Sequence, residues 1–202
     1  MNKELSVSLS PAAVAAPTRA TALLRAFGIV LGGSLLAAVC AHVSIPLFFT
    51  PVPLSLAPFA VLLLGLLLSP RLAAATFAAY LIEGAAGLPV FSPSPAISGF
   101  AHLVGPTGGY LLAYPLAGAL ISFLWRRSGR NFSAALLCAA VGDVAILTCG
   151  ALWLAAMAPL PSLSAPTLAI FPFLPGDALK IAAAAAMAVS LRRLRRSVPE
   201  NA

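Results

Sequence analysis

The sequence predicts an all-α integral membrane protein, a bundle of six transmembrane helices with its N and C termini in the cytoplasm. Two observations predict this class. Hydrophobic residues make up 61% of the chain and charged residues only 8%, and the mean hydropathy is +1.02. Such a composition exceeds what a soluble domain tolerates. The second observation is that Lys and Arg gather in clusters separated by long apolar stretches.

The basic clusters predict the topology. Cytoplasmic loops retain Lys and Arg during membrane insertion, so all the clusters belong on one side. Each stretch between clusters is too long for one spanning helix and about right for two, which gives three hairpins that turn outside. Lys180 alone lies apart. The clusters hold Lys3, Arg19 and Arg25; Arg71; Arg126, Arg127 and Arg130; and Arg192, Arg193, Arg195 and Arg196.

Each helix is an apolar run bounded by a cluster. The first, third and fifth helices run outward from a cluster, and the second, fourth and sixth return to one. The second has a short apolar core and ends just before Arg71. The expected helices are 23–43, 58–68, 72–86, 108–125, 133–158 and 176–191.

The helices occupy one domain, 23–191, between two tails. Residues 1–22 mix Ser, Pro and Ala and are expected to be a disordered cytoplasmic tail rather than a cleaved signal peptide. Residues 192–202 form a basic cytoplasmic tail. No room remains for a soluble energy-coupling domain, which must be another chain. The net charge of +7 lies beside membrane spans and predicts contacts with membrane lipid, not with nucleic acid.

The three outer connections lack Lys and Arg but are rich in Pro and Phe. Proline restricts the backbone, so these connections are expected to be ordered. An ordered aromatic layer can cap an outward-facing ligand pocket. The alternative is an aromatic belt at the membrane interface.

Four ionisable groups lie away from the basic clusters: Glu83, Asp143, Asp177 and Lys180. Each costs about 2.5–3.5 kcal/mol at a helix centre on insertion scales, so each needs a partner or a cavity. Asp177 and Lys180 share one face of the sixth helix, and Glu83 lies at the same outer level. We interpret these three as a ligand site. Alternatively, Asp177 only caps the helix and Lys180 pairs with it.

Four further patterns say less about function. Asp143 is expected to form a structural hydrogen bond to a neighbouring helix. Gly33, Ala37 and Ala41 form a small-xxx-small ridge that either docks a partner or packs inside the bundle. Ser98 and His102 faintly resemble an intramembrane serine protease, but Ala96 replaces a Gly of that pattern, so we assign no catalytic residue. The three cysteines lie in apolar stretches and predict no metal site.

Several motifs resemble the BioY family, the biotin-binding S-components of energy-coupling factor (ECF) transporters. They are IPLFFTPVPLSL, EGAAGLPVF, GPTGGYLLAYPLAG and FLPGDALK, within 44–180. The resemblance implies a six-helix S-component fold in the bacterial cytoplasmic membrane that captures biotin from outside. It also implies no enzymatic activity and no cofactor, since biotin is the transported ligand. The pocket would include Asp177 and Lys180 from the PGD-x-x-K motif, and Tyr110.

The resemblance further implies partners, namely a transmembrane coupling protein and two ABC-type ATPase subunits. The ridge of Gly33, Ala37 and Ala41 would meet the coupling protein. Phe91 and Phe173 would cover the apolar bicycle of biotin, while Asp177 could accept from its ureido N–H groups and Lys180 could meet an acceptor oxygen. The sequence does not decide which end of biotin each of these two residues meets. The alternative function is a stand-alone biotin facilitator or proton-coupled carrier, with Glu83 and Asp143 as the relay.

Overall fold

The computed structural model describes residues 18–94, 98–157 and 170–197, with side chains to Leu194. Each of the six predicted segments is helical, so the helical class is confirmed. α1 begins at Arg19, inside the predicted tail, because the hydroxyl of Thr18 caps it by accepting from the Thr21 amide. The elements are α1 (Arg19–His42), β1 (Ser44–Ile45), β2 (Leu54–Ser55), α2 (Ala57–Leu67), α3 (Pro70–Ala85), α4 (Ala101–Val104), α5 (Gly108–Arg127), α6 (Phe132–Met157) and α8 (Leu174–Ser197).

Four of these helices, α1, α5, α6 and α8, are long and apolar enough to cross a membrane. The chain is therefore a multi-pass membrane protein. α2 has 11 residues and α3 has 16, which correspond to about 16 and 24 Å against a hydrocarbon core of about 30 Å. The six predicted spans are thus four long helices and two short ones. Residues 1–17 of the predicted tail lie outside the described part of the chain.

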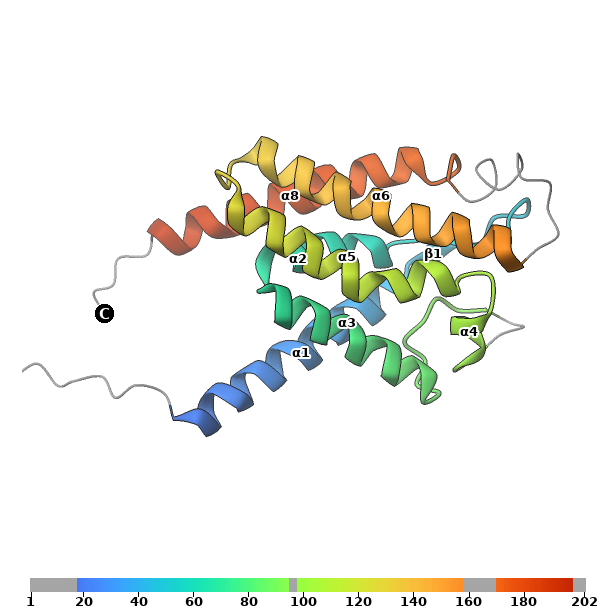
Figure 1. Cartoon of the computed structure of the whole chain (residues 1–202), viewed down its shortest axis with the longest axis horizontal. Helices are drawn as coiled ribbons and strands as arrows, with labels where there is room; N and C mark the ends of the chain where they lie inside the picture. The colour runs from blue at the N-terminus through green and yellow to red at the C-terminus, as the bar shows by residue number, and fades with distance from the viewer. Residues whose placement is uncertain (1–17, 95–97, 158–169, 198–202) are drawn as a thin grey trace, which may run out of the picture.

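The bundle has two unlike ends (Figure 1). One end holds the start of α1, the α2–α3 and α5–α6 turns and the end of α8, and we call it the basic end because Arg19, Arg71, Arg126 and Arg192 lie on these segments. The opposite end, the ribbon end, holds α4 and the β1–β2 ribbon. Both described chain ends thus lie at the basic end, as the distribution of Lys and Arg predicts.

The ribbon is an antiparallel pair in which Ser44 faces Ser55 and Ile45 faces Leu54. It closes the connection between α1 and α2. Pro46, Pro51 and Pro53 lie between its strands, and proline cannot donate to a ladder, so the pairing stops after two residues per strand.

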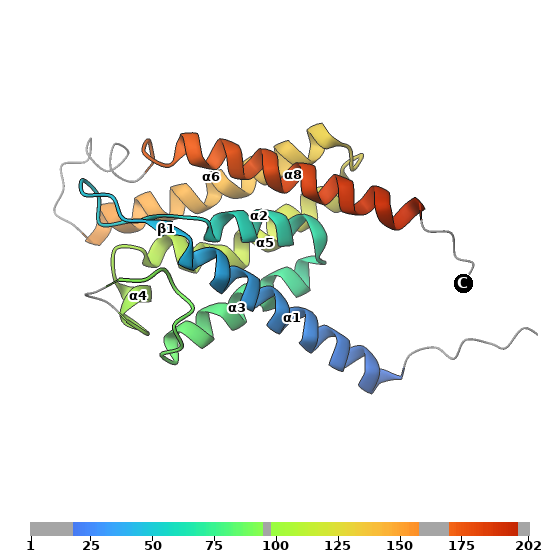
Figure 2. The same cartoon turned by 180° about the vertical axis from the view of Figure 1, so that it is seen from behind.

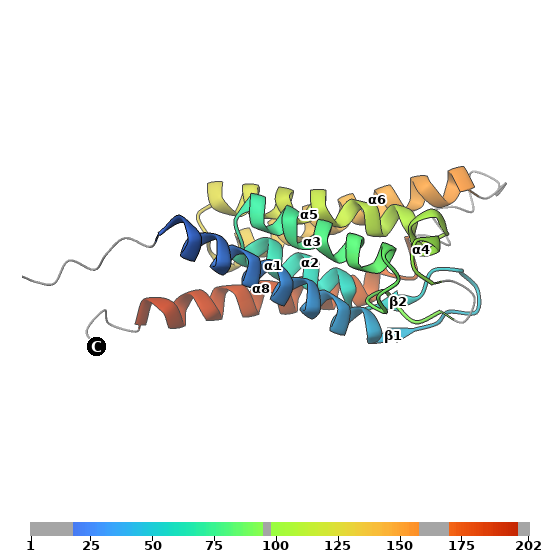
Figure 3. The ribbon, with the colours of Figure 1, turned by 90° about the horizontal axis from the view of Figure 1, so that it is seen from below.

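α2 lies in the middle of the bundle, with α5 and α6 on one side and α1 and α8 on the other (Figure 3). Every residue from Ala60 to Leu66 is buried. A helix that is apolar all round belongs inside a bundle, which explains why α2 can be short. Gly65 lets α5 approach, because a Cβ there would meet the Ile121 side chain at 2.9 Å.

The small-residue ridge on α1 is internal. Ala37 and Ala41 have no exposed surface, and a Cβ on Gly33 would meet the Thr76 side chain on α3 at 2.7 Å. The prediction that Gly33, Ala37 and Ala41 dock a partner is therefore corrected. Gly33 lets α1 pack closely on α3, and Ala37 and Ala41 belong to the hydrophobic core, which is the second of the two interpretations. The first half of α1 projects away from the bundle instead (Figure 2).

Candidate functional site

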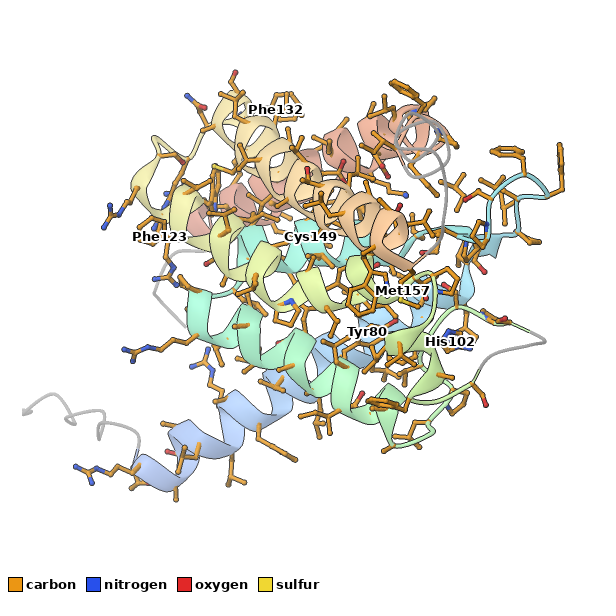
Figure 4. The ribbon with its side chains drawn as sticks, turned by 45° about the vertical axis from the view of Figure 1, so that its right-hand side comes forward. Tyr80, His102, Phe123, Phe132, Cys149 and Met157 are labelled. Carbon is orange, nitrogen blue, oxygen red and sulfur yellow. The ribbon has the colours of Figure 1, made fainter. Side chains whose placement is uncertain are left out.

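A cavity of about 220 Å³ lies at the ribbon end, below the β1–β2 connection. Its walls come from six parts of the chain: the ribbon connection, the stretch 91–94 after α3, α4 with the turn that follows it, and the facing sides of α5, α6 and α8. Tyr80 and His102 lie at this end of the bundle, whereas Phe123 and Phe132 lie at the other (Figure 4). Helices fix most of the wall, and proline-rich segments form the lid side.

Asp177 and Lys180 line this cavity from the first two turns of α8. The Lys180 ammonium donates to Asp177 Oδ1 at 2.8 Å, and only 8% and 4% of the two side chains are exposed. α8 begins at Leu174, so Asp177 lies inside the first turn and not at the cap position. The structure therefore brings the pair into a cavity, as the ligand-site interpretation requires.

Asp143 faces the same cavity from the middle of α6. Its residue is 3% exposed. Among the described residues, none donates a hydrogen bond to its carboxylate, so the predicted structural bond to a neighbouring helix is not found. Lys180 thus has a carboxylate partner in Asp177, and a second carboxylate shares its cavity. A site with more acceptors than cations favours a ligand that donates N–H groups.

Aromatic rings form the apolar walls. On one side, Tyr110 and Phe173 lie 6.1 Å apart between ring centroids. On the other, Phe91 contacts both His102 and Tyr80 edge to face, each at 5.3 Å. The Tyr80 hydroxyl donates to the carbonyl of Val90 at 3.1 Å, which holds the chain beside Phe91. Such walls suit a flat apolar ring system.

The glycine-rich turn before α5 positions Tyr110. A Cβ on Gly108 would collide with the carbonyl of Leu103, and one on Gly109 would collide with Trp153 on α6. Trp153 Nε1 donates to the carbonyl of Gly105 at 2.9 Å and ties the turn to α6. The glycines therefore serve the close packing of α5 against α4 and α6. That packing places Tyr110 in the cavity wall.

Five of the six predicted ligand residues line the cavity: Phe91, Tyr110, Phe173, Asp177 and Lys180. The structure does not bring Glu83 there. The Glu83 carboxylate accepts a hydrogen bond from the hydroxyl of Ser34 on α1. Thr76 and Glu83 lie seven residues apart on one face of α3, and both contact α1. On the next face, Tyr80 contacts the ring of Phe91, and Gly84 leaves room for that ring.

Sequence reasoning missed His102 and Tyr114 as cavity residues and gave Asp143 another role. His102 is buried, and this burial lowers the pKa of its imidazole below the ordinary value of 6.5. Its four-residue spacing from Ser98 suggested a protease, but Ser98 is exposed and does not line the cavity. A better signal for His102 is its place in a Pro- and Gly-rich outer connection, next to the GPTGGY motif.

Comparison with known proteins identifies the family. A model of the BioY family matches residues 10–197. The probable biotin transporter BioY of Pyrococcus horikoshii is 38% identical over 142 residues, covering 70% of this chain and 82% of that protein. The biotin transporter BioY of Lactococcus lactis subsp. cremoris is 31% identical over 157 residues, covering 75% and 80%.

A solved structure shares the fold. It is the 2.1 Å crystal structure of the S-component for biotin from an ECF-type ABC transporter. The two structures superpose with a TM-score of 0.78 at 25% sequence identity, and the match covers 88% of this chain and 95% of that one. The family match covers most of the sequence, and the fold match agrees with it. This chain belongs to the BioY family.

Proposed function

We propose that this chain is the substrate-capture subunit of an ECF-type biotin transporter and that it binds biotin in the cavity at the ribbon end. The observation that carries the proposal is the buried Asp177–Lys180 pair, which faces Asp143 between aromatic walls. Biotin's ureido ring has two N–H donors and one C=O acceptor on a compact apolar bicycle. The carboxylates can accept from the N–H groups, and the Lys180 ammonium can donate to the carbonyl.

Titration of the purified full-length chain with biotin and with lipoate tests this proposal. Lipoate carries the same type of carboxylate chain and a sulfur ring but has no ureido group. Biotin should bind and lipoate should not, because only biotin matches the acceptor-rich side of the cavity. Equal binding of both, or of neither, would remove the assignment of the cavity to biotin.

The proposed orientation places the ribbon end outside and the basic end in the cytoplasm, in a bacterial cytoplasmic membrane. The positive-inside rule supports it, because Arg71, Arg126 and Arg192 lie on segments of the basic end. In a variant without Cys40, Cys138 and Cys149, Ser94→Cys should react with an impermeant maleimide in intact cells. Ser128→Cys, at the basic end, should stay unlabelled, and labelling there would reverse the orientation.

We further propose that the subunit works with a transmembrane coupling protein and two ABC-type ATPases. Because the ridge at Ala37 is buried, the partner surface on α1 moves to the exposed side of its first half. Gly28 and Gly32 lie there four residues apart, with no atom of the described chain within 4 Å of a Cβ at either. Small residues at this spacing allow a second helix to approach closely in a membrane.

The alternative of a proton-coupled carrier used Glu83 and Asp143 as a relay. Glu83 is hydrogen-bonded to Ser34 and lies outside the cavity that Asp143 lines. The site therefore does not favour a proton-coupled carrier. Biotin uptake in cells that lack the ATPase subunits separates the two functions. The ECF proposal expects uptake to fall with the ATPases, and a carrier would keep it as long as a proton gradient exists.

A further inference from the structure

A second cavity, of about 270 Å³, opens at the basic end between α2, α5 and α8. Its polar wall holds three arginines from three segments: Arg126 at the end of α5, Arg130 in the α5–α6 turn and Arg192 near the end of α8. Its apolar wall holds Trp125 and the leucines that end α2, Leu66 to Leu68. We propose that this cavity binds the phosphate of an anionic phospholipid from the adjacent membrane leaflet.

The turn that carries Arg130 is held in a defined shape. Arg130 has φ 53°, in the left-handed region that glycine adopts most easily. The arginine holds this conformation although a glycine, Gly129, stands next to it in the chain. The hydroxyl of Ser128 accepts from the Arg130 amide at 3.3 Å, and Asn131 Oδ1 accepts from the Ala134 amide at 2.8 Å. A long cationic side chain at a strained position suggests that the side chain itself has a function.

α8 is attached to this turn through a second arginine. Arg192 Nη1 donates to the carbonyl of Arg130 at 3.1 Å. This bond spans 62 residues and joins the two sides of the cavity. The guanidinium of Arg192 is thereby held at the cavity wall opposite α5, close to the turn. The positive groups that line the cavity therefore lie on a framework that is already built.

Arg126 and Arg130 have no acidic partner within the described chain. Its carboxylates are Glu83, Asp143 and Asp177, and none lines this cavity. By contrast, Arg127, the last residue of α5, stacks on Phe123, with its Cζ 4.2 Å from the ring centroid, and does not line the cavity. Guanidinium groups that converge at the edge of an apolar medium repel one another, and a bound anion offsets that repulsion.

The chemistry of the two walls selects the ligand. Guanidinium groups bind phosphate oxygens through paired hydrogen bonds. The apolar wall can hold the glycerol and the first methylenes of an acyl chain, and a tryptophan is typical at this depth of a membrane. Basic pockets between transmembrane helices bind anionic headgroups, whereas a choline group would be repelled by the arginines. Phosphatidylglycerol is therefore the appropriate probe.

Native mass spectrometry of the delipidated full-length chain, titrated with phosphatidylglycerol or phosphatidylcholine, tests the proposal. The unmodified chain should bind phosphatidylglycerol about tenfold more tightly than phosphatidylcholine. Arg126→Gln and Arg130→Gly should each lower phosphatidylglycerol affinity about tenfold, since each removes charge-assisted hydrogen bonds. Arg130→Gly also relaxes the left-handed backbone and keeps the carbonyl that Arg192 contacts. A strained or misfolded turn therefore cannot explain a loss of phosphatidylglycerol affinity in this variant.

Arg127→Gln and Arg193→Gln are the matched controls, because each removes one positive charge beside the cavity without lining it. Both should keep affinity within about twofold. A loss in the controls as large as in Arg126→Gln would show diffuse surface attraction and overturn the site. Equal binding of the two lipids would also overturn it. Displacement of phosphatidylglycerol by inorganic phosphate at the same concentration would assign the cavity to a free anion and overturn the proposal that its ligand is a phospholipid.

Discussion

Asp177 and Lys180 at the ribbon end are paired and buried, whereas most arginines at the basic end lie exposed. Burial removes most of the water around the Asp177–Lys180 pair, so each partner depends on the other and on the ligand that enters the cavity. The exposed arginines keep water or headgroups around them and depend little on any one neighbour. A single substitution should therefore change biotin affinity strongly at the ribbon end and leave it nearly unchanged at the basic end.

The largest expected effect comes from Lys180→Met. It removes the cation of the cavity and leaves Asp177 without its partner. Biotin affinity should fall by about 1.5–3 kcal/mol, roughly 10- to 150-fold, in a calorimetric titration of the purified chain. Arg193→Gln, on the same helix but at the basic end, should leave affinity unchanged. Unchanged affinity in Lys180→Met, with a lower melting temperature, would reduce the pair to a support of α8.

A second test separates the buried ridge from the exposed side of α1. Ala37→Leu forces a large side chain into the contact between α1 and the rest of the bundle and should lower the free energy of unfolding by about 1–3 kcal/mol. Gly32→Leu meets no neighbour within the described chain and should leave stability nearly unchanged, while reducing co-purification with the coupling protein. Melting curves and pull-down of both variants give the comparison. The reverse pattern would restore the ridge as the docking surface.

The positions of the helices could be predicted because hydropathy and the distribution of Arg are properties of segments. The place of Asp177 and Lys180 in a cavity wall could also be predicted, because two charges three residues apart in an apolar helix are rare and energetically costly. The rotation of each helix about its own axis, which decides which residues face the cavity, could not be predicted. α6 is apolar on all sides, so nothing in its sequence says that Asp143 faces a cavity, and on α3 one residue step separates Glu83 from Gly84, which packs on Phe91.

Small residues are ambiguous for a related reason. Gly33 and Ala37 permit close approach by any helix, whether of this chain or of another. The outcome depends on which helix the loops bring nearest, and for Gly33 that helix is α3. The position of His102 is likewise set by the tertiary structure, because its place in the cavity wall depends on α4 and the turn after it, both of which lie between the long helices.

Asp143→Asn tests whether that cavity carboxylate contacts the ligand. The amide keeps the shape and one acceptor oxygen but loses the charge, so biotin affinity should fall by about 1 kcal/mol, roughly fivefold. Stability should stay the same or rise, because no described residue donates to the Asp143 carboxylate. Glu83→Gln is the matched control outside the cavity and should bind biotin normally. Lower stability with normal affinity would return Asp143 to a structural role.

The smallest effect is a pH dependence from His102. Burial disfavours its charged form, so its pKa lies below the ordinary value of 6.5 in the folded chain. Between these two pKa values the unfolded chain binds more protons than the folded one, so stability is complete above about pH 6.5 and is lost as the pH falls toward the lowered pKa. The slope is at most about 1.4 kcal/mol per pH unit for one group. Melting curves from pH 7.5 to 5 should show this loss, and His102→Gln should reduce it. His42→Gln, at an exposed histidine of α1, is the matched control and should retain the slope of the unmodified chain. An equal slope in the unmodified chain and in His102→Gln would mean that the ribbon end does not depend on a neutral imidazole in its wall.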